Sequence, residues 1–169
     1  ALSVDRGKEV SMTDSVRKQM WEALSASPFV MLHLSNSHDH AIPMAAQLDP
    51  DAESEFWFYT TRDNRVAQGG PAMAQFTSLG HDLFCCISGT LVEETDKAVI
   101  DRYWSNAVAA WYDQGRNDPN LLMMRFELDD AEIWTRDSSF KGLFKLMSGQ
   151  KVNEGELGQH KVVDLESAS

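Results

Sequence analysis

The chain has 169 residues and a net charge of −11 at pH 7, and 43% of its residues are hydrophobic. This length and composition predict one globular domain with a substantial single core. The acidity argues against general affinity for nucleic acids, whose phosphate backbone needs a basic surface. No apolar run approaches the length of a membrane span, and no leader pattern stands at the N-terminus. We therefore expect a cytoplasmic protein with no membrane partner.

The first predicted element is an amphipathic helix. Residues 1–10 are polar and lack periodicity, so we expect a flexible lead. Ser11 and Thr13 are both candidate N-caps, after which apolar residues recur at helical spacing as far as Leu24. The pattern ends at Pro28, so the helix is expected to end before it.

A hairpin is predicted next. Residues 29–34 are a compact apolar run typical of a strand, and residues 41–48 form its return strand. The turn between them holds His38, Asp39 and His40, which are residue types that ligate zinc or iron. Such metals usually take three or four protein ligands, and no second cluster of suitable spacing follows. We interpret the turn as solvated and predict no metal site.

The third strand is strongly aromatic and leads into a polar turn. Residues 56–59 read Phe-Trp-Phe-Tyr, and their alternation predicts a strand covered on both faces. The residues that follow are Thr60, Thr61, Arg62, Asp63, Asn64 and Arg65. Arginine forks onto phosphate oxygens, and hydroxyl and backbone donors fill the remaining acceptor positions. The alternatives at this stretch are therefore a phosphate site and a polar turn without a ligand.

Two further strands are predicted at residues 72–78 and 83–93. In the second of them, Gly89 indicates a bulge or a close backbone approach. Cys85 and Cys86 are adjacent, so a strand sends them to opposite faces, and we interpret both as small buried hydrophobic residues. Five strands at this short spacing favour a small antiparallel barrel over a parallel sheet.

One longer helix is predicted from Thr95 or Asp96, either of which can cap it, to about Gly115. Its apolar stripe places Trp104 and Trp111 on nearly one face. We expect this face to cover the barrel or a partner subunit. The stripe offers more apolar surface than one small barrel needs, which predicts a homodimer.

Residues 121–128 and 131–136 predict a final hairpin that turns at Asp129 and Asp130. After it, residues 141–147 carry Lys141 and Lys145 on one helical face, and a short strand is expected at 160–165. The chain is thus divided into a flexible lead at 1–10, a domain at 11–147 and a polar tail at 148–169.

The chain resembles the pyridoxamine 5′-phosphate oxidase-like flavoproteins, specifically their bacterial general stress protein branch. The resemblance covers about residues 12–147 and rests on the helix and hairpin followed in order by FWFYTTRDNR, GHDLFCCISGTLVEETD, IDRYWSNAVAAWY and AEIW. It implies a mainly β fold with flanking helices, which is an antiparallel Greek-key split barrel of six to seven strands with the helices packed outside. It also implies a homodimer that binds FMN in two clefts at the subunit interface.

The resemblance implies a phosphate site at the end of the aromatic strand. In the oxidase pattern a Phe-Tyr-Thr strand end followed by Ser-Arg-Lys holds the flavin phosphate. Here Tyr59 and Thr60 match the strand end, Asn64 takes the serine position and Arg65 the arginine position. Val66 replaces the lysine, so one phosphate partner is missing.

The missing charge would have to come from Arg62, or from Lys141 of either subunit. Trp134 resembles the oxidase tryptophan near the flavin, but the Arg-x-His pattern that grips the oxidase substrate does not follow it. Other charged or polar positions of the oxidase pattern are taken by Ile42, Pro43, Met44, Phe84 and Cys86. We therefore expect a flavin cleft without pyridoxamine phosphate oxidation.

The chemistry of FMN fits several residues of this stretch. Its phosphate carries nearly two negative charges, and its flat ring system is mostly apolar with polar edges. Arg65 would neutralise the phosphate, with Thr60, Thr61 and Asn64 as donors, and Met44, Phe58 and an aromatic residue of the partner subunit would cover the ring.

No acid–base pair names a reaction, so no catalytic residue is assigned. The first interpretation is an FMN-dependent oxidoreductase with a small-molecule substrate, since redox chemistry belongs to the cofactor. The alternatives are a non-catalytic flavin- or haem-binding stress or sensor protein, and a dimeric barrel that has lost its ligand.

Overall fold

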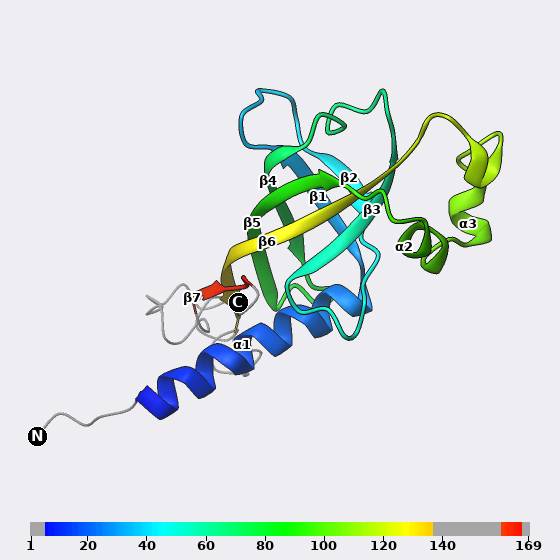
Figure 1. Ribbon diagram of the computed structural model, residues 1–169. Coiled ribbons are helices and arrows are strands. Elements are labelled where there is room, and N and C mark those ends of the chain that lie inside the picture. The colour runs from blue at the N-terminus through cyan, green and yellow to red at the C-terminus, as the bar shows by residue number, and fades with distance from the viewer. Residues whose placement is uncertain (1–5, 137–159, 167–169) are drawn as a thin grey trace, which may run out of the picture.

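The computed structural model describes residues 6–136 and 160–166, with side chains from residue 13 onward. Figure 1 shows the elements, which are α1 (Arg6–Ala26), β1 (Phe29–Leu34), β2 (Ile42–Ala45), β3 (Glu55–Thr61), β4 (Gly70–Thr77), β5 (Leu83–Glu93), α2 (Lys97–Arg102), α3 (Asn106–Ala109), the 3-10 turn η1 (Gly115–Asn117), β6 (Leu121–Thr135) and β7 (His160–Asp164).

The strands form one antiparallel sheet in the order β2-β1-β4-β5-β6-β3. The first half of β6 pairs with β3, and its second half pairs with β7. The sheet curls round its core, and its two edges approach each other at one bridge between Gln47 and Trp57. Two backbone hydrogen bonds of 2.7 and 3.0 Å form this bridge. The sheet is not closed, and the predicted antiparallel sheet of split-barrel type is confirmed.

The helix α1 lies across one end of the sheet (Figure 1). Val16, Met20 and Leu24 recur every four residues and are fully buried, so one stripe of the helix faces the core. The predicted helix is confirmed, but it begins at Arg6 rather than at a cap at Ser11 or Thr13. The helix therefore includes residues that we expected in the flexible lead.

The predicted long helix after β5 is wrong. The structure has two short helices, α2 and α3, because the Ser105 hydroxyl accepts a hydrogen bond from the backbone of Val108 and starts a new helix. Between the two helices, the Tyr103 ring stacks on Trp57 of β3, with ring centroids 5.2 Å apart. Trp111 is 83% exposed, so it does not share a buried helix face with Trp104.

The predicted final hairpin is also wrong, because β6 is one continuous strand. Its pairing with β5 shifts between Ser88, which faces Asp130, and Gly89, which faces Leu128. This shift leaves Asp129 as the extra residue of a β-bulge. The aspartates therefore mark a bulge rather than a turn, and the bulge predicted at Gly89 is confirmed.

The remaining strands agree closely with the sequence. The hairpin of β1 and β2 is present, although β2 ends at Ala45, and β5 has the predicted bounds. The short strand predicted at 160–165 is β7. Cys85 is buried whereas Cys86 is partly exposed on the other face, so only Cys85 is the buried residue that we predicted.

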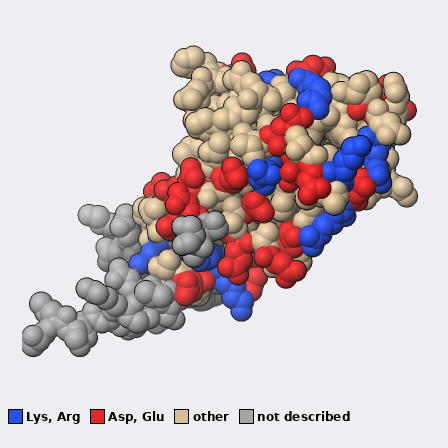
Figure 2. Space-filling model, viewed as in Figure 1, with Lys and Arg blue, Asp and Glu red and all other residues tan. Residues whose placement is uncertain are grey.

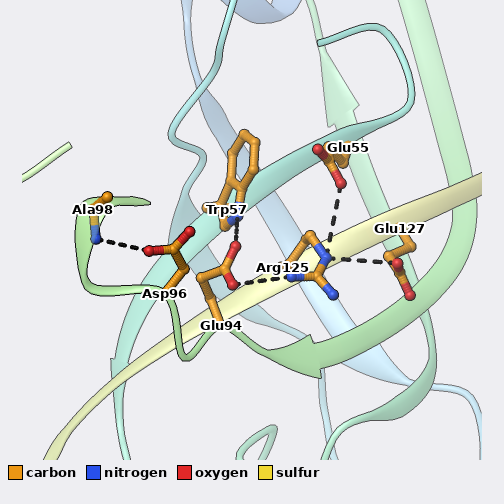
Figure 3. A network of polar contacts seen from close by, with 7 residues as sticks. All are labelled: Glu55, Trp57, Glu94, Asp96, Ala98, Arg125 and Glu127. Atoms are coloured by element: carbon orange, nitrogen blue, oxygen red, sulfur yellow. Dashed lines mark hydrogen bonds and ion pairs between the residues drawn. The ribbon is translucent and has the colours of Figure 1, made fainter. Parts of the chain in front are cut away.

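A network of polar contacts joins β3, β5 and β6 on the outside of the barrel (Figure 3). The Arg125 guanidinium donates to Glu94 at 3.0 Å and also lies near Glu55 and Glu127. The second oxygen of Glu94 accepts from the indole nitrogen of Trp57 at 3.0 Å. Burial raises the pKa of Glu55 in spite of its cationic neighbour. The network thus holds three strands together around one cation.

Candidate functional site

The outer face of the sheet carries its exposed side chains in rows, because paired residues of antiparallel strands point to the same side. One row crosses β4 to β7 and consists of Thr77, Phe84, Trp134 and His160. The next row crosses β2 to β7 and consists of Pro43, Met31, Gln75, Cys86, Glu132 and Val162. Several of these residues are large and apolar, although they face outward.

An open groove of about 510 Å³ lies along these two rows. Its lining includes Met31, Pro43, Gln75, Phe84, Cys86 and Trp134, and none of the described residues that line it is charged. Phe84 and Trp134 are each 41% exposed, and Phe29 at the groove's edge is 63% exposed. In the view of Figure 2, Lys, Arg, Asp and Glu gather across the middle and the right of the molecule, and the upper left is largely free of them. The groove suits a flat, mostly apolar ligand.

Few polar groups line the groove. The amide nitrogen of Gln75 lies 3.1 Å from ring nitrogen Nε2 of His33, and 3.7 Å from the sulfur of Cys86. These side chains come from β1, β4 and β5, which place them on the same face. Gln75 and Cys86 line the groove, so a ligand there would find an amide and a thiol beside its polar edges, with His33 behind the amide.

The polar turn after β3 presents two arginines, Arg62 and Arg65, which differ in their partners. Arg65 is exposed, and its guanidinium donates to the backbone oxygen of His40 at 3.0 Å. Within residues 6–136 and 160–166, no ion pair joins Arg65 to an acidic residue. Arg62 differs, because it pairs with Glu93 at 2.8 Å. Arg65 is thus the better placed of the two for an anion.

Other hydrogen bonds fix the shape of this turn. The side-chain oxygen of Asn64 accepts from the backbone nitrogen of Val66 at 3.0 Å. The Thr61 hydroxyl donates to Asp63 at 2.5 Å, and this hydrogen bond lowers the pKa of the Asp63 carboxyl. The turn therefore holds a carboxylate as well as the guanidinium of Arg65.

Three predicted site residues lie in the core. Met44 is 9% exposed, Val66 is 1% exposed and Phe58 is fully buried. Their side chains pack among the hydrophobic residues inside the barrel, so in this arrangement they face protein rather than the groove. The burial of Val66 explains how an apolar residue is accommodated where the oxidase pattern has lysine.

Tyr59 and Thr60, at the end of β3, form hydrogen bonds with the segment after β5. The hydroxyl of Tyr59 donates to the backbone oxygen of Ile100, and the hydroxyl of Tyr112 donates to the backbone oxygen of Thr60, both at 2.5 Å. Burial raises the pKa of Tyr59 and of Tyr112 to about 12. Both phenols therefore stay protonated at neutral pH and hold the segment after β5 against β3.

The structure thus gathers only part of the predicted site. Thr61, Asn64 and Arg65 lie together in the turn, and Trp134 lies in the groove. Lys141 falls outside the described residues.

The strand β1 connects the two parts. Met31 is three residues from the end of β1, about 10 Å at the usual rise of a strand, and the following loop brings His40 to Arg65.

The groove itself was not predicted from the sequence. Phe29 and Met31 alternate with buried residues of β1, and this alternation was a usable signal for an outward apolar face. His160 was expected only as the first residue of the short strand at 160–165, because nothing in the polar tail indicates that this strand pairs with β6.

Within the described parts of the chain, no group of three or more His, Cys, Asp or Glu residues could hold a metal ion. The same residues contain no helix that is both long and apolar enough to cross a membrane.

The sequence profile of the family described as "Pyridoxamine 5'-phosphate oxidase like" matches residues 14–156 and so ends before β7. No curated protein matches the sequence.

Several solved structures are similar. A general stress family protein from Xanthomonas campestris pv. campestris is 43% identical, with a TM-score of 0.68, over 75% of this chain and 91% of that chain. A protein described as a general stress FMN/FAD binding protein from Xanthomonas citri is also 43% identical, with a TM-score of 0.68, over 75% and 93% of the two chains. General stress protein 26 from Jannaschia sp. CCS1 is 24% identical and shares the fold, with a TM-score of 0.72, over 90% and 99%.

Proposed function

The chain belongs to the pyridoxamine 5′-phosphate oxidase-like family, and on this basis we propose that it binds FMN and is an FMN-dependent oxidoreductase of a small-molecule substrate. The observation that carries the proposal is a groove whose described lining holds no charged residue. The strand β1 and its loop connect this groove to Arg65, which forms no ion pair with a carboxylate of the described residues. The FMN/FAD-binding description of the Xanthomonas citri protein supports a flavin in particular.

The residues present fit FMN. A volume of about 510 Å³ lies in the range usual for ligand pockets. The apolar lining suits the ring system, and Gln75 can hydrogen-bond to a polar ring edge. Arg65, Thr61 and Asn64 can hold the phosphate at the turn. The strand β1 runs from the groove towards the loop that contacts Arg65, so one FMN molecule would lie along this strand.

When bound, FMN supplies the redox chemistry, and the protein binds it, orients it and keeps water from its ring. Val66 and Phe58 contribute to FMN binding only indirectly, because they are buried beneath the turn and the strand. Arg62 is held by Glu93, so it contributes less to phosphate binding than Arg65 does. Pyridoxamine phosphate is not proposed as the substrate, because the Arg-x-His pattern is absent after Trp134.

We also propose that a second copy of the chain covers the outer face and completes the cofactor cleft. Phe29 and Val162 are 63% and 65% exposed there, beside the half-exposed Met31, Phe84 and Trp134. A contiguous apolar face of this kind is uncommon on monomers and commonly closes against a twofold mate.

The FMN proposal is tested by titrating the protein with FMN and following flavin fluorescence. Arg65→Ala should weaken binding about 10- to 150-fold, the usual range for a lost charged hydrogen bond. Arg116→Ala is the matched control, because Arg116 is an exposed arginine paired with Asp101. Unchanged affinity in Arg65→Ala would remove the phosphate assignment. Oxidation of NADH or NADPH in an acceptor screen then separates an enzyme from a flavin carrier.

The dimer is tested by sedimentation at micromolar concentration. Phe29→Lys should shift the protein to monomers, whereas Trp111→Lys should not, because Trp111 is exposed on the segment after α3, away from this face. A dimer that survives Phe29→Lys but not Trp111→Lys would instead support the interface that sequence analysis placed on the helical segment. A monomeric wild-type protein would contradict a shared cleft.

A further inference from the structure

We infer that His160 of β7 is a positioning residue for the groove, because it fixes the orientation of the Trp134 ring that a flat ligand meets. The inference rests on the proposed flavin-binding function and names a residue that acts on the ligand through Trp134. It assigns a role to the C-terminal strand, which lies beyond the family match.

The geometry of His160 is set from two directions. Its imidazole stacks on the Trp134 indole, with ring centroids 5.0 Å apart and planes at 2°. Its Nε2 atom lies 2.7 Å from a carboxylate oxygen of Glu132. His160 of β7 is the cross-strand partner of Trp134 of β6. Glu132 lies two residues before Trp134 on β6, so its side chain points to the same face of the sheet. The Glu132 carboxylate thus orients the imidazole, and the imidazole stacks on the Trp134 indole.

The stack bears directly on the groove. Trp134 lines the groove and is 41% exposed, and Phe84 is its neighbour in the row on the side away from His160. A half-exposed indole without such a neighbour can turn about its side-chain torsions. His160 therefore holds one wall of the groove ready for a planar ligand, which lowers the cost of ordering that wall on binding.

Stability alone does not account for this arrangement. The His160 and Glu132 side chains are 50% and 45% exposed, and exposed ion pairs contribute little to folding. The stack involves a ring of the groove rather than a ring of the core. The contacts of His160 therefore fix the position of the Trp134 ring.

The experiment measures FMN affinity and tryptophan emission in the full-length chain. His160→Ala should raise the dissociation constant of FMN about 2- to 10-fold, the range expected for a lost aromatic contact. His160→Phe keeps a stacking ring without the hydrogen bond to Glu132, so it should stay within about 2-fold of wild type. Lys161→Ala, at the next position of β7, controls for general damage to the strand.

Emission gives a readout that does not depend on the ligand. His160→Ala should change the emission of the protein, and the same substitution in a Trp134→Phe background should not. This comparison isolates Trp134 from the other four of the five tryptophans.

The outcomes separate the two proposals. If wild-type protein binds FMN and His160→Ala binds it equally well, the positioning role is wrong and the proposed function stands. If His160→Phe is as weak as His160→Ala, the stack is not the cause and the inference fails. Equal weakening by Lys161→Ala would also overturn it, because the effect would then belong to β7 as a whole. If wild-type protein binds no FMN, the proposed function fails and the inference fails with it.

Discussion

Arg125→Met is predicted to destabilise the fold strongly through the network in Figure 3. The substitution keeps a side chain of similar length but removes the cation among Glu94, Glu55 and Glu127. Glu94 is 8% exposed and would keep only the indole donor of Trp57. Its negative charge would then be buried without a counter-charge.

The magnitude follows from the burial of each pair. Removing one partner of a fully buried ion pair costs about 3–5 kcal/mol, and each exposed pair adds about 0–1 kcal/mol. Arg125 itself is 27% exposed, so solvent screens part of the effect. We therefore expect a loss of about 2–4 kcal/mol in the free energy of unfolding, measured by urea denaturation at pH 7.

Two further variants make this prediction specific. Adding Glu94→Gln to Arg125→Met should recover about 1–2 kcal/mol, because the amide removes the unpaired charge and still accepts from Trp57. Arg116→Met is the control, since its ion pair with Asp101 is about half exposed and should contribute about 0–1 kcal/mol. A loss below about 1 kcal/mol for Arg125→Met, or no recovery in the double variant, would refute the reasoning.

Three other predictions concern the fold and the groove. Gly89→Ala should cost about 1–3 kcal/mol in urea unfolding, because a Cβ there meets a β6 backbone oxygen and lies 2.8 Å from an aromatic ring carbon; unchanged stability would contradict the close approach. Tyr112→Phe should cost about 0.5–1.5 kcal/mol in the same assay, since it removes the hydrogen bond from the Tyr112 hydroxyl to the backbone oxygen of Thr60. A thiol reagent should label Cys86 in the native protein but Cys85 only after unfolding, because burial raises the pKa of the Cys85 thiol; native labelling of both would be inconsistent with this packing.

The strands were predictable because local signals and tertiary pairing agree. Alternating side chains and turn residues mark β1, β3, β4 and β5. The pairing of β1 with β4 and of β3 with β6 joins segments far apart in the sequence, and local signals do not reveal it. The segment after β5 was not predictable in the same way. Its apolar stripe has the same spacing whether the helix is continuous or broken, and the break depends on the packing of Tyr103 and Trp104 against β3.

The false hairpin has a similar cause. Two adjacent aspartates favour a turn, but β5 pairs with β6 on both sides of them and keeps the chain extended. Only the partner strand reveals that Asp129 is the extra residue of a bulge. Local turn propensity was overridden by eleven paired positions along β5.

The site was predictable where one short segment carries it. Arg65, Thr61 and Asn64 lie within one turn, so sequence order brings them together. Alternation alone does not say which face is the interior, and Phe58 lies on the core side. The groove combines residues of five strands, and His160 reaches Trp134 only through the pairing of β7 with β6.

The central claim is tested most directly by the visible spectrum of the purified protein, recorded after FMN is added and the excess removed. If the protein binds FMN as proposed, flavin bands at about 375 and about 450 nm stay with the protein. A colourless protein would contradict a flavin cleft, and a Soret band before FMN is added would point to haem instead.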